Sequence, residues 1–152
     1  RFFMKIEVET LIQAPPAVCF DLARDMDLHV ESAHKTREKI VAGRKNGLLE
    51  LGETVVFEAV HFGIRQRFSA KITESAPPHR FTDEMTRGAF RSFVHQHEFE
   101  ARGDYCLMRD TLIYQTPFGI FGAVFNFLFL RRHLRAFIEE RAKIIKQHAE
   151  KG

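Results

Sequence analysis

The C-terminal part of the chain carries the pattern that decides the fold, and it reads IFGAVFNFLFLRRHLRAFIEERAKII (120–145). Its apolar residues recur at steps of three and four, the spacing that places side chains on one face of an α-helix. The members of this stripe are Ile120, Val124, Phe127, Leu130, Leu134, Phe137 and Ile144. The charged residues fall largely elsewhere. The pattern therefore predicts one amphipathic helix of more than about twenty residues.

Upstream of this helix the sequence has a period of two, which is typical of half-buried β-strands. Six runs alternate in this way, at 4–13, 54–62, 64–73, 80–86, 90–101 and 105–116. Their short connections favour antiparallel neighbours. The prolines of APP (14–16) end the first run, and we expect two short helices after it.

The strands and the helix together predict the fold class. An antiparallel sheet with one apolar face must be covered, and the C-terminal helix is the only predicted element large enough to cover it. We expect an α+β protein in which a curved antiparallel sheet of about six to seven strands wraps around that helix. Residues 1–152 are expected to form one domain, because this length lies in the usual range for a domain.

Four stretches strengthen this expectation: LIQAPPAVCFDLARD (11–25), LELGETVVFEA (49–59), PPHRFTDEMTRGAF (77–90) and LMRDTLIYQTPFG (107–119). They resemble segments of the START-like, Bet v 1-like superfamily, also called SRPBCC, and most closely those of an uncharacterised bacterial subgroup. The resemblance covers nearly the whole chain and implies the helix-grip fold. The superfamily includes lipid carriers, plant allergens, polyketide cyclases and aromatases, so the fold alone does not select a function.

Polar residues on the apolar face of the late strands are the candidate site. In FVHQHEFE (93–100) the alternation places Phe93, His95, His97 and Phe99 on one face. The same parity points Asp83 and Asp110 of the flanking strands toward these histidines, and His61 adds a ring from an earlier strand. A slip of one residue in the strand register would turn the whole set toward solvent.

Three interpretations of this set remain open. The residues could form a structural network in a non-catalytic module with a filled core, since buried polar residues are usually just hydrogen-bonded. They could orient a small, mainly hydrophobic ligand such as a lipid or a polyketide-like aromatic in a cavity. They could also catalyse a cyclisation or dehydration, with His95 or His97 paired to Asp83 or Asp110, or hold zinc or iron. We predict ligand binding, with no metal and no cofactor. The expected apolar walls are Phe57, Phe68, Phe93, Val124, Phe127 and Leu128.

Composition limits the remaining function classes. The chain contains 16 phenylalanines and no tryptophan, which favours a wide core or an apolar cavity. A formal charge of +3 without a continuous basic stripe predicts no binding to nucleic acid. Cys19 and Cys106 are far apart and form no CxxC motif, so we expect two buried thiols in the cytoplasm. His29 and Glu31 are expected on a solvated face near the cavity mouth.

Two apolar stretches bear on membranes and targeting. PFGIFGAVFNFLFL (117–130) is too short to cross a bilayer, so it predicts the buried start of the long helix, with membrane association as the minor alternative. The N-terminal RFFMKIEVET becomes polar at once and predicts no signal peptide. The sequence does not show whether Arg1 to Phe3 are native residues, and it does not indicate the oligomeric state.

Overall fold

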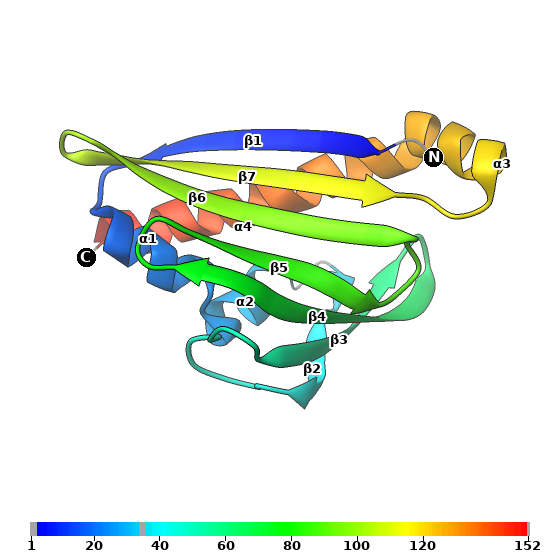
Figure 1. Cartoon of the computed structure of the whole chain (residues 1–152), viewed down its shortest axis with the longest axis horizontal. Helices are drawn as coiled ribbons and strands as arrows, with labels where there is room; N and C mark the ends of the chain where they lie inside the picture. Colours follow the sequence, from blue (N-terminus) through cyan, green and yellow to red (C-terminus); the bar gives the residue numbers. More distant parts are fainter. Residues whose placement is uncertain (1–2, 34–35, 152) are drawn as a thin grey trace.

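The structure, a computed structural model, describes residues 3–33 and 36–151. Arg1 and Phe2, for which the sequence left open whether they are native, lie outside the described residues. Within the described ranges, seven antiparallel strands form one curved sheet in the order β1-β7-β6-β5-β4-β3-β2 (Figure 1). The strands are β1 (Met4–Ile12), β2 (Lys39–Gly43), β3 (Thr54–His61), β4 (Ile64–Ala76), β5 (Arg80–Arg87), β6 (Ser92–Arg102) and β7 (Tyr105–Gln115). The predicted α+β helix-grip architecture is confirmed.

Two short helices follow β1, as predicted, and one long helix ends the chain. Pro16 opens α1 (Pro16–Ala23), where its missing N–H costs nothing. Asp25 caps α2 (Met26–Ser32) by accepting hydrogen bonds from the backbone N–H groups of Asp27 and Leu28. The long helix comprises α3 (Gly119–Phe125), a π-helical segment (Asn126–Leu130) and α4 (Arg131–Lys151). Figure 1 shows α4 crossing the sheet, and it contacts β1, α1 and α2.

The core is densely filled at the end of the molecule that carries α1. Phe20 of α1 packs edge-on against Phe81 and Phe99 of the sheet, with ring centroids 5.3 and 5.5 Å apart. Met108 and Ile145 belong to the same buried cluster. Because this end is closed by side chains, the space described below lies between the other half of the sheet and the long helix.

Side chains of α4 bind the backbone of the edge strand β1. Arg135 donates a hydrogen bond to the carbonyl oxygen of Glu7 at 3.3 Å, and Lys146 donates to that of Leu11 at 2.6 Å. These contacts fix α4 along the edge of the sheet and satisfy carbonyl groups of the strand.

The stretch 117–130 corrects the prediction of a buried helix start. Phe118, Phe121 and Phe127 are 80%, 80% and 83% exposed. Figure 1 gives the reason, since α3 extends past the end of the sheet. No helix among those described combines the length and apolar character that a membrane crossing requires.

Three residues of this stretch are buried against the body of the protein. They are Gly122, Asn126 and Leu130, at steps of four. A Cβ on Gly122 would lie 2.0 Å from the carbonyl oxygen of Pro117, so only glycine fits there. Asn126 accepts a hydrogen bond from the Tyr114 hydroxyl at 2.5 Å. The start of the long helix therefore presents its apolar face to water.

Candidate functional site

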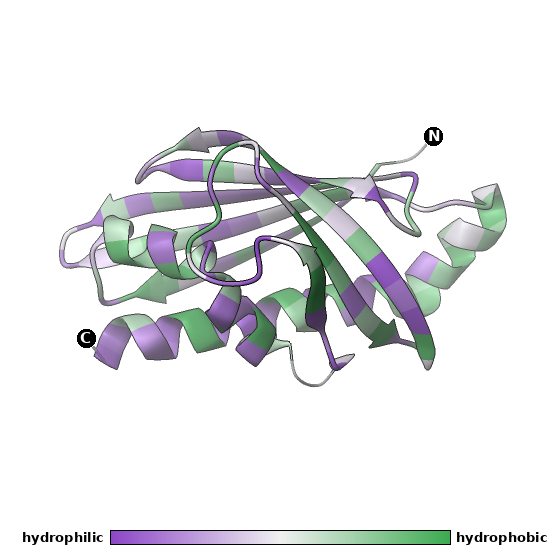
Figure 2. Cartoon of the chain, turned by 90° about the horizontal axis from the view of Figure 1, so that it is seen from below, coloured by the Kyte–Doolittle hydropathy of each residue, from purple (hydrophilic) through white to green (hydrophobic). Residues whose placement is uncertain are grey.

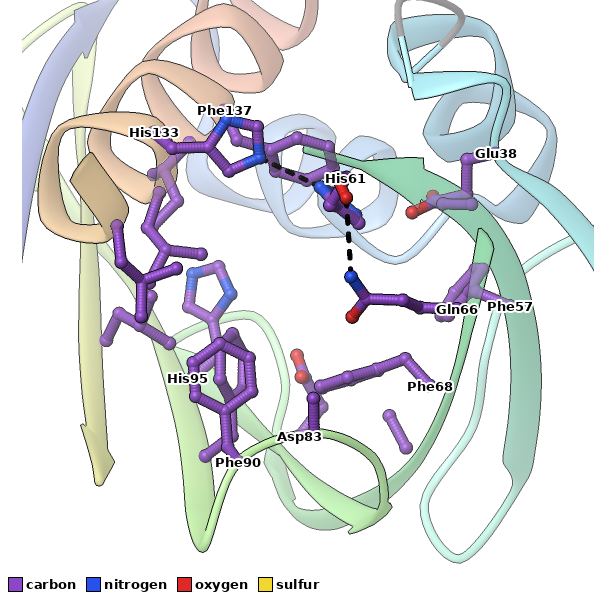
Figure 3. A pocket seen from close by; sticks show the side chains of 18 of the residues that line it. Glu38, Phe57, His61, Gln66, Phe68, Asp83, Phe90, His95, His133 and Phe137 are labelled. Atoms are coloured by element: carbon purple, nitrogen blue, oxygen red, sulfur yellow. Dashed lines mark hydrogen bonds between the residues drawn. The ribbon is translucent and has the colours of Figure 1, made fainter. Parts of the chain in front are cut away.

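A cavity of about 750 Å³ lies between the sheet, α2 and the long helix. Phe57, Phe68 and Phe93 line it from the sheet, where the sequence placed them. The helix contributes Phe121, Phe125, Leu134, Phe137 and Ile138. Figure 3 shows Phe68, Phe90 and Phe137 around a space into which a few polar side chains project. The walls are thus mainly apolar and rich in phenylalanine, and polar groups are fewer.

Strand register brings the histidines and aspartates of the late strands together. Asp83 of β5 pairs with His95 of β6, and His97 pairs with Asp110 of β7. His95, His97 and Asp110 are buried, and Asp83 is partly buried. The face parity expected from the sequence is confirmed, whereas a role of these residues in ligand binding stays a prediction.

His97 lies at the centre of a hydrogen-bonded network. Its Nε2 is 2.8 Å from Oδ2 of Asp83, and its Nδ1 is 3.3 Å from Oδ1 of Asp110. The same oxygen of Asp110 is 2.9 Å from Nε2 of His95. The His97 ring is stacked between Phe81 and His95, with centroid distances of 4.1 and 3.8 Å. His97 and Asp110 therefore stand behind the cavity wall, and His95 and Asp83 form part of it.

Hydrogen bonds decide the charge of this network. Burial alone disfavours charged groups, which lowers the pKa of histidine and raises that of aspartate. In His97 the hydrogen bonds to Asp110 and Asp83 outweigh burial and raise the pKa. In Asp83 and Asp110 the histidine hydrogen bonds outweigh burial and lower the pKa. Burial and the charge of His97 lower the pKa of His95. These shifts favour two carboxylates, the protonated form of His97 and the neutral form of His95.

His95 offers a basic nitrogen to the cavity. Its Nε2 donates to Asp110, which fixes the tautomer and leaves the lone pair on Nδ1. Among the described residues Nδ1 has no hydrogen-bond partner, and Figure 3 shows the ring projecting into the cavity. A neutral imidazole held by a carboxylate is able to accept a proton from a bound molecule.

The same residues are the strongest candidates for metal binding in the described part of the chain. Ligand atoms of Asp83, His95 and His97 lie within 4.8 Å of one another. However, both ring nitrogens of His97 already face carboxylates, and the two imidazoles are stacked with an interplanar angle of 23°. Stacked rings direct their lone pairs side by side, whereas a metal needs them to converge on one point. The geometry favours a hydrogen-bonded network.

His61 lines the cavity but contacts the helix and not this network. Its Nδ1 is 2.8 Å from Nε2 of His133, a residue of α4 that the sequence did not single out (Figure 3). Burial, and then repulsion by His133, lowers the pKa of His61; burial lowers that of His133. The two neutral rings share one hydrogen bond across the space between sheet and helix.

A second polar group faces the cavity from the opposite side. Glu38 and His29 line it, with Nε2 of His29 2.5 Å from Oε1 of Glu38, and the His29 ring stacks on Phe57 at 4.6 Å. Burial raises the pKa of Glu38, but the attraction of His29 outweighs it, so the pKa is lowered. The expectation that His29 is solvated is wrong because Phe57 and Glu38 cover it. Glu31 is exposed, as expected.

The predicted helix wall is also corrected. Val124, Phe127 and Leu128 are 51%, 83% and 47% exposed and do not line the cavity. The helix wall before α4 is formed instead by Phe121, Gly122, Phe125 and Leu130. An uninterrupted apolar run has no polar positions to mark which face turns inward, so the sequence did not distinguish these two sets.

Comparisons with known proteins bear on the fold. No protein-family model and no curated protein sequence matches the chain. Solved structures do. TTHA0849 from Thermus thermophilus has a TM-score of 0.78 at 21% identity, over 96% of this chain and 97% of its own. A START superfamily protein from Mycobacterium smegmatis has a TM-score of 0.72 at 13% identity, over 97% of each chain.

A third structure is twice as long as this chain. The di-domain ARO/CYC StfQ, from the steffimycin biosynthetic pathway, has a TM-score of 0.77 at 10% identity. The match covers 98% of this chain and 51% of StfQ. At such identities structural similarity reports the fold and not the activity. The sheet order, the long covering helix and the similarity to these structures together show that the chain has a helix-grip fold.

Proposed function

We propose that the protein binds a small, mainly hydrophobic molecule in the cavity between sheet and helix. The observation that carries this proposal is the cavity itself, about 750 Å³ with mainly apolar, phenylalanine-rich walls. Small-molecule sites are typically about 300 to 1,000 Å³, apolar, and furnished with a few polar groups that orient the ligand. The fold supports the proposal, because the neighbours include a START superfamily protein and an ARO/CYC protein.

The polar groups narrow the ligand class. His95 and Asp83 face the cavity from the sheet, and Glu38 and Arg141 face it from elsewhere on the wall. Because polar groups line two sides of the cavity, a ligand with hydroxyl or carbonyl groups can hydrogen-bond to them, whereas a purely aliphatic ligand cannot. We propose an amphipathic lipid or a polyketide-like aromatic that carries hydroxyl or carbonyl groups and packs its apolar body against the phenylalanines.

Filling the cavity tests this proposal. Protein purified from its own host would be examined by native mass spectrometry for a bound molecule, and the stripped protein would be titrated with a fluorescent apolar dye. Ala70 lines the cavity and is buried, so Ala70→Leu should weaken dye binding by about tenfold or more. Ala136→Leu, the same change at a position of α4 that does not line the cavity, should bind as the parent does.

The alternatives give different results. A parent protein that is free of ligand and binds no dye would contradict the proposal and favour a non-catalytic module. Equal dye binding by the parent and Ala70→Leu would place the bound dye outside the cavity, which also contradicts it.

A second function, acid–base catalysis of cyclisation or dehydration, is favoured by the environment of His95. Its neutral ring, its free Nδ1 and its hydrogen bond to Asp110 are the features of a general base. The test uses whatever molecule co-purifies. His95→Gln should retain its binding within a few-fold and lose its conversion by about a hundredfold or more. Equal conversion by both proteins would exclude His95 as the base.

The remaining proposals concern location and partners. Cys19 and Cys106 are free thiols, which is the usual state in a reducing compartment, and we propose that the protein acts in the cytoplasm. Nucleic acid is not proposed as a partner, because the cavity is apolar and the charge is only +3.

A further inference from the structure

The exposed phenylalanines of the long helix form the most unusual surface of the protein. We call this surface the apolar tip and define it by the residues Phe62, Ile64, Phe118, Ile120, Phe121, Val124, Phe125, Phe127, Leu128 and Phe129, which are 41% to 83% exposed. Figure 2 shows the helix start as a largely hydrophobic projection at one end of the molecule. Contiguous apolar surface of this kind marks an interaction site in soluble proteins.

Two parts of the chain build the apolar tip. The β3–β4 turn brings Phe62 to α3, where its ring lies 5.2 Å from that of Phe125. Phe62 has a φ of 53°, in the left-handed region that phenylalanine rarely adopts. Gly122 and Asn126 hold the other side of the helix against β7 and the segment that follows it. The apolar side chains are therefore presented outward by a fixed scaffold.

The charged residues in the segments that build and adjoin the apolar tip all have one sign. Three segments run through this end of the sheet, 62–73, 85–97 and 111–138, and none contains an aspartate or a glutamate. Exposed arginines occur in all three segments: Arg65, Arg87, Arg91, Arg131 and Arg132. A second copy of the chain would bring like charges together and oppose association. An anionic surface would gain from both the arginines and the phenylalanines.

We propose that this end of the protein docks on an anionic lipid bilayer. The phenylalanines enter the boundary between headgroups and acyl chains, and the arginines contact lipid phosphates, as in helices that lie in the membrane surface. Phe118, Phe121 and Phe125 also line the cavity, so docking places its mouth at the bilayer. This last step rests on the proposed ligand binding, whereas docking itself does not.

Vesicle binding tests the proposal with the intact protein. Vesicles of phosphatidylcholine alone are compared with vesicles that contain phosphatidylcholine and phosphatidylglycerol in equal parts, in a co-sedimentation assay. The protein should bind the anionic vesicles and release as salt is raised. Phe127→Asp should weaken binding by about thirtyfold or more, because Phe127 is 83% exposed and lies outside the cavity. Arg132→Glu should weaken it by about tenfold.

Matched controls come from residues outside the apolar tip. Leu51→Asp removes an apolar side chain that is 60% exposed, and Lys45→Glu reverses an exposed charge; both should bind as the parent does. The absence of tryptophan allows a direct reporter. The emission of Phe127→Trp should shift to shorter wavelength on anionic vesicles, and that of Leu51→Trp should not.

Three results would overturn the proposal. The first is equal sedimentation with and without vesicles. The second is a loss of binding in Leu51→Asp as large as that in Phe127→Asp. The third is a stable dimer that Phe127→Asp converts to monomers without any vesicle binding by the parent, which would assign the apolar tip to a second copy of the chain. If Ala70→Leu loses dye binding but still binds anionic vesicles, then docking by the apolar tip does not depend on ligand binding in the cavity.

Discussion

Two regions reverse the usual placement of side chains in opposite ways: the apolar tip, and the floor of the cavity, by which we mean Asp83 and His95 in the wall with His97 and Asp110 directly behind it. On the floor, His95, His97 and Asp110 are buried beside aromatic rings. At the tip, Phe118 and Phe127 face water, and the neighbouring contacts to the sheet are made by a glycine and an asparagine.

The two regions differ in whether the unfavourable free energy of this placement is offset within the molecule. Buried charges cost several kcal/mol unless they are paired, and each charged group on the floor has a partner at hydrogen-bond distance. The phenylalanines of the tip have no comparable cover in the described part of the chain. The floor is therefore explained from within the molecule, whereas the tip requires something outside it.

Removing a partner from the floor should have the largest effect on stability. Asp110→Asn removes the carboxylate shared by His95 and His97, and we expect a loss of about 3 kcal/mol or more in the free energy of unfolding. The measurement is urea denaturation. Glu9→Gln is the control, since Glu9 pairs at 2.8 Å with Arg109 on the outer face of the sheet and should cost less than about 1 kcal/mol. Similar losses in both variants would show that the buried network is not special.

A change of pH should have the second-largest effect on the free energy of unfolding, and it should act through the histidines on both sides of the cavity. The pKa values of His61, His133 and His95 are lowered, so their contribution to stability is complete above about pH 6.5 and is lost as the pH falls toward the lowered values. The pKa of His97 is raised, so its contribution is complete below that pH and is lost as the pH rises through the raised value. Urea midpoints measured between about pH 5 and pH 9 report both the loss of stability on the acid side (the acid limb) and the loss on the alkaline side.

A single substitution tests how much of the acid limb comes from the His61–His133 pair. His133→Leu should flatten it, because the ring that repels protonated His61 is gone. His148→Leu changes an exposed histidine of the same helix and should leave the limb as in the parent. Identical acid limbs in the parent and His133→Leu would contradict the assignment.

Substitution at the apolar tip should have the smallest effect on folding. Phe127→Ser should change the free energy of unfolding by less than about 0.5 kcal/mol, since the ring is 83% exposed. Phe20→Ala, at a ring that is 1% exposed, should cost about 3 to 5 kcal/mol. A large loss in Phe127→Ser would mean that the tip is part of the folded core and would weaken the contrast with the floor.

The sheet and the network were predictable because strand alternation carries both. The parity of Asp83, His95, His97 and Asp110 follows from a period of two, and the register places them together without a slip. The strand β2 was missed, because it is a five-residue edge strand with a bulge between Ile40 and Ala42 and so shows no alternation.

The start of the long helix was not predictable for two physical reasons. The run from 117 to 130 is apolar almost throughout, so no polar face marks the inward side. The π-helical segment Asn126–Leu130 also shifts the phase of the helix, so the stripe read from α4 does not continue into α3. The pairs His29–Glu38 and His61–His133 join separate elements at no fixed spacing, and the sequence alone held no signal for them.

The contacts between α4 and β1 also limit how copies of the protein can assemble. An edge strand with unoccupied carbonyl groups is a template onto which a strand from another molecule can add. Here Arg135 and Lys146 hold the carbonyl oxygens of Glu7 and Leu11. At the far edge, β2 is short, bulged and begins with a lysine. Both edge strands thus disfavour the addition of a strand from another molecule. The protein can therefore expose the apolar tip without forming fibrils through its backbone.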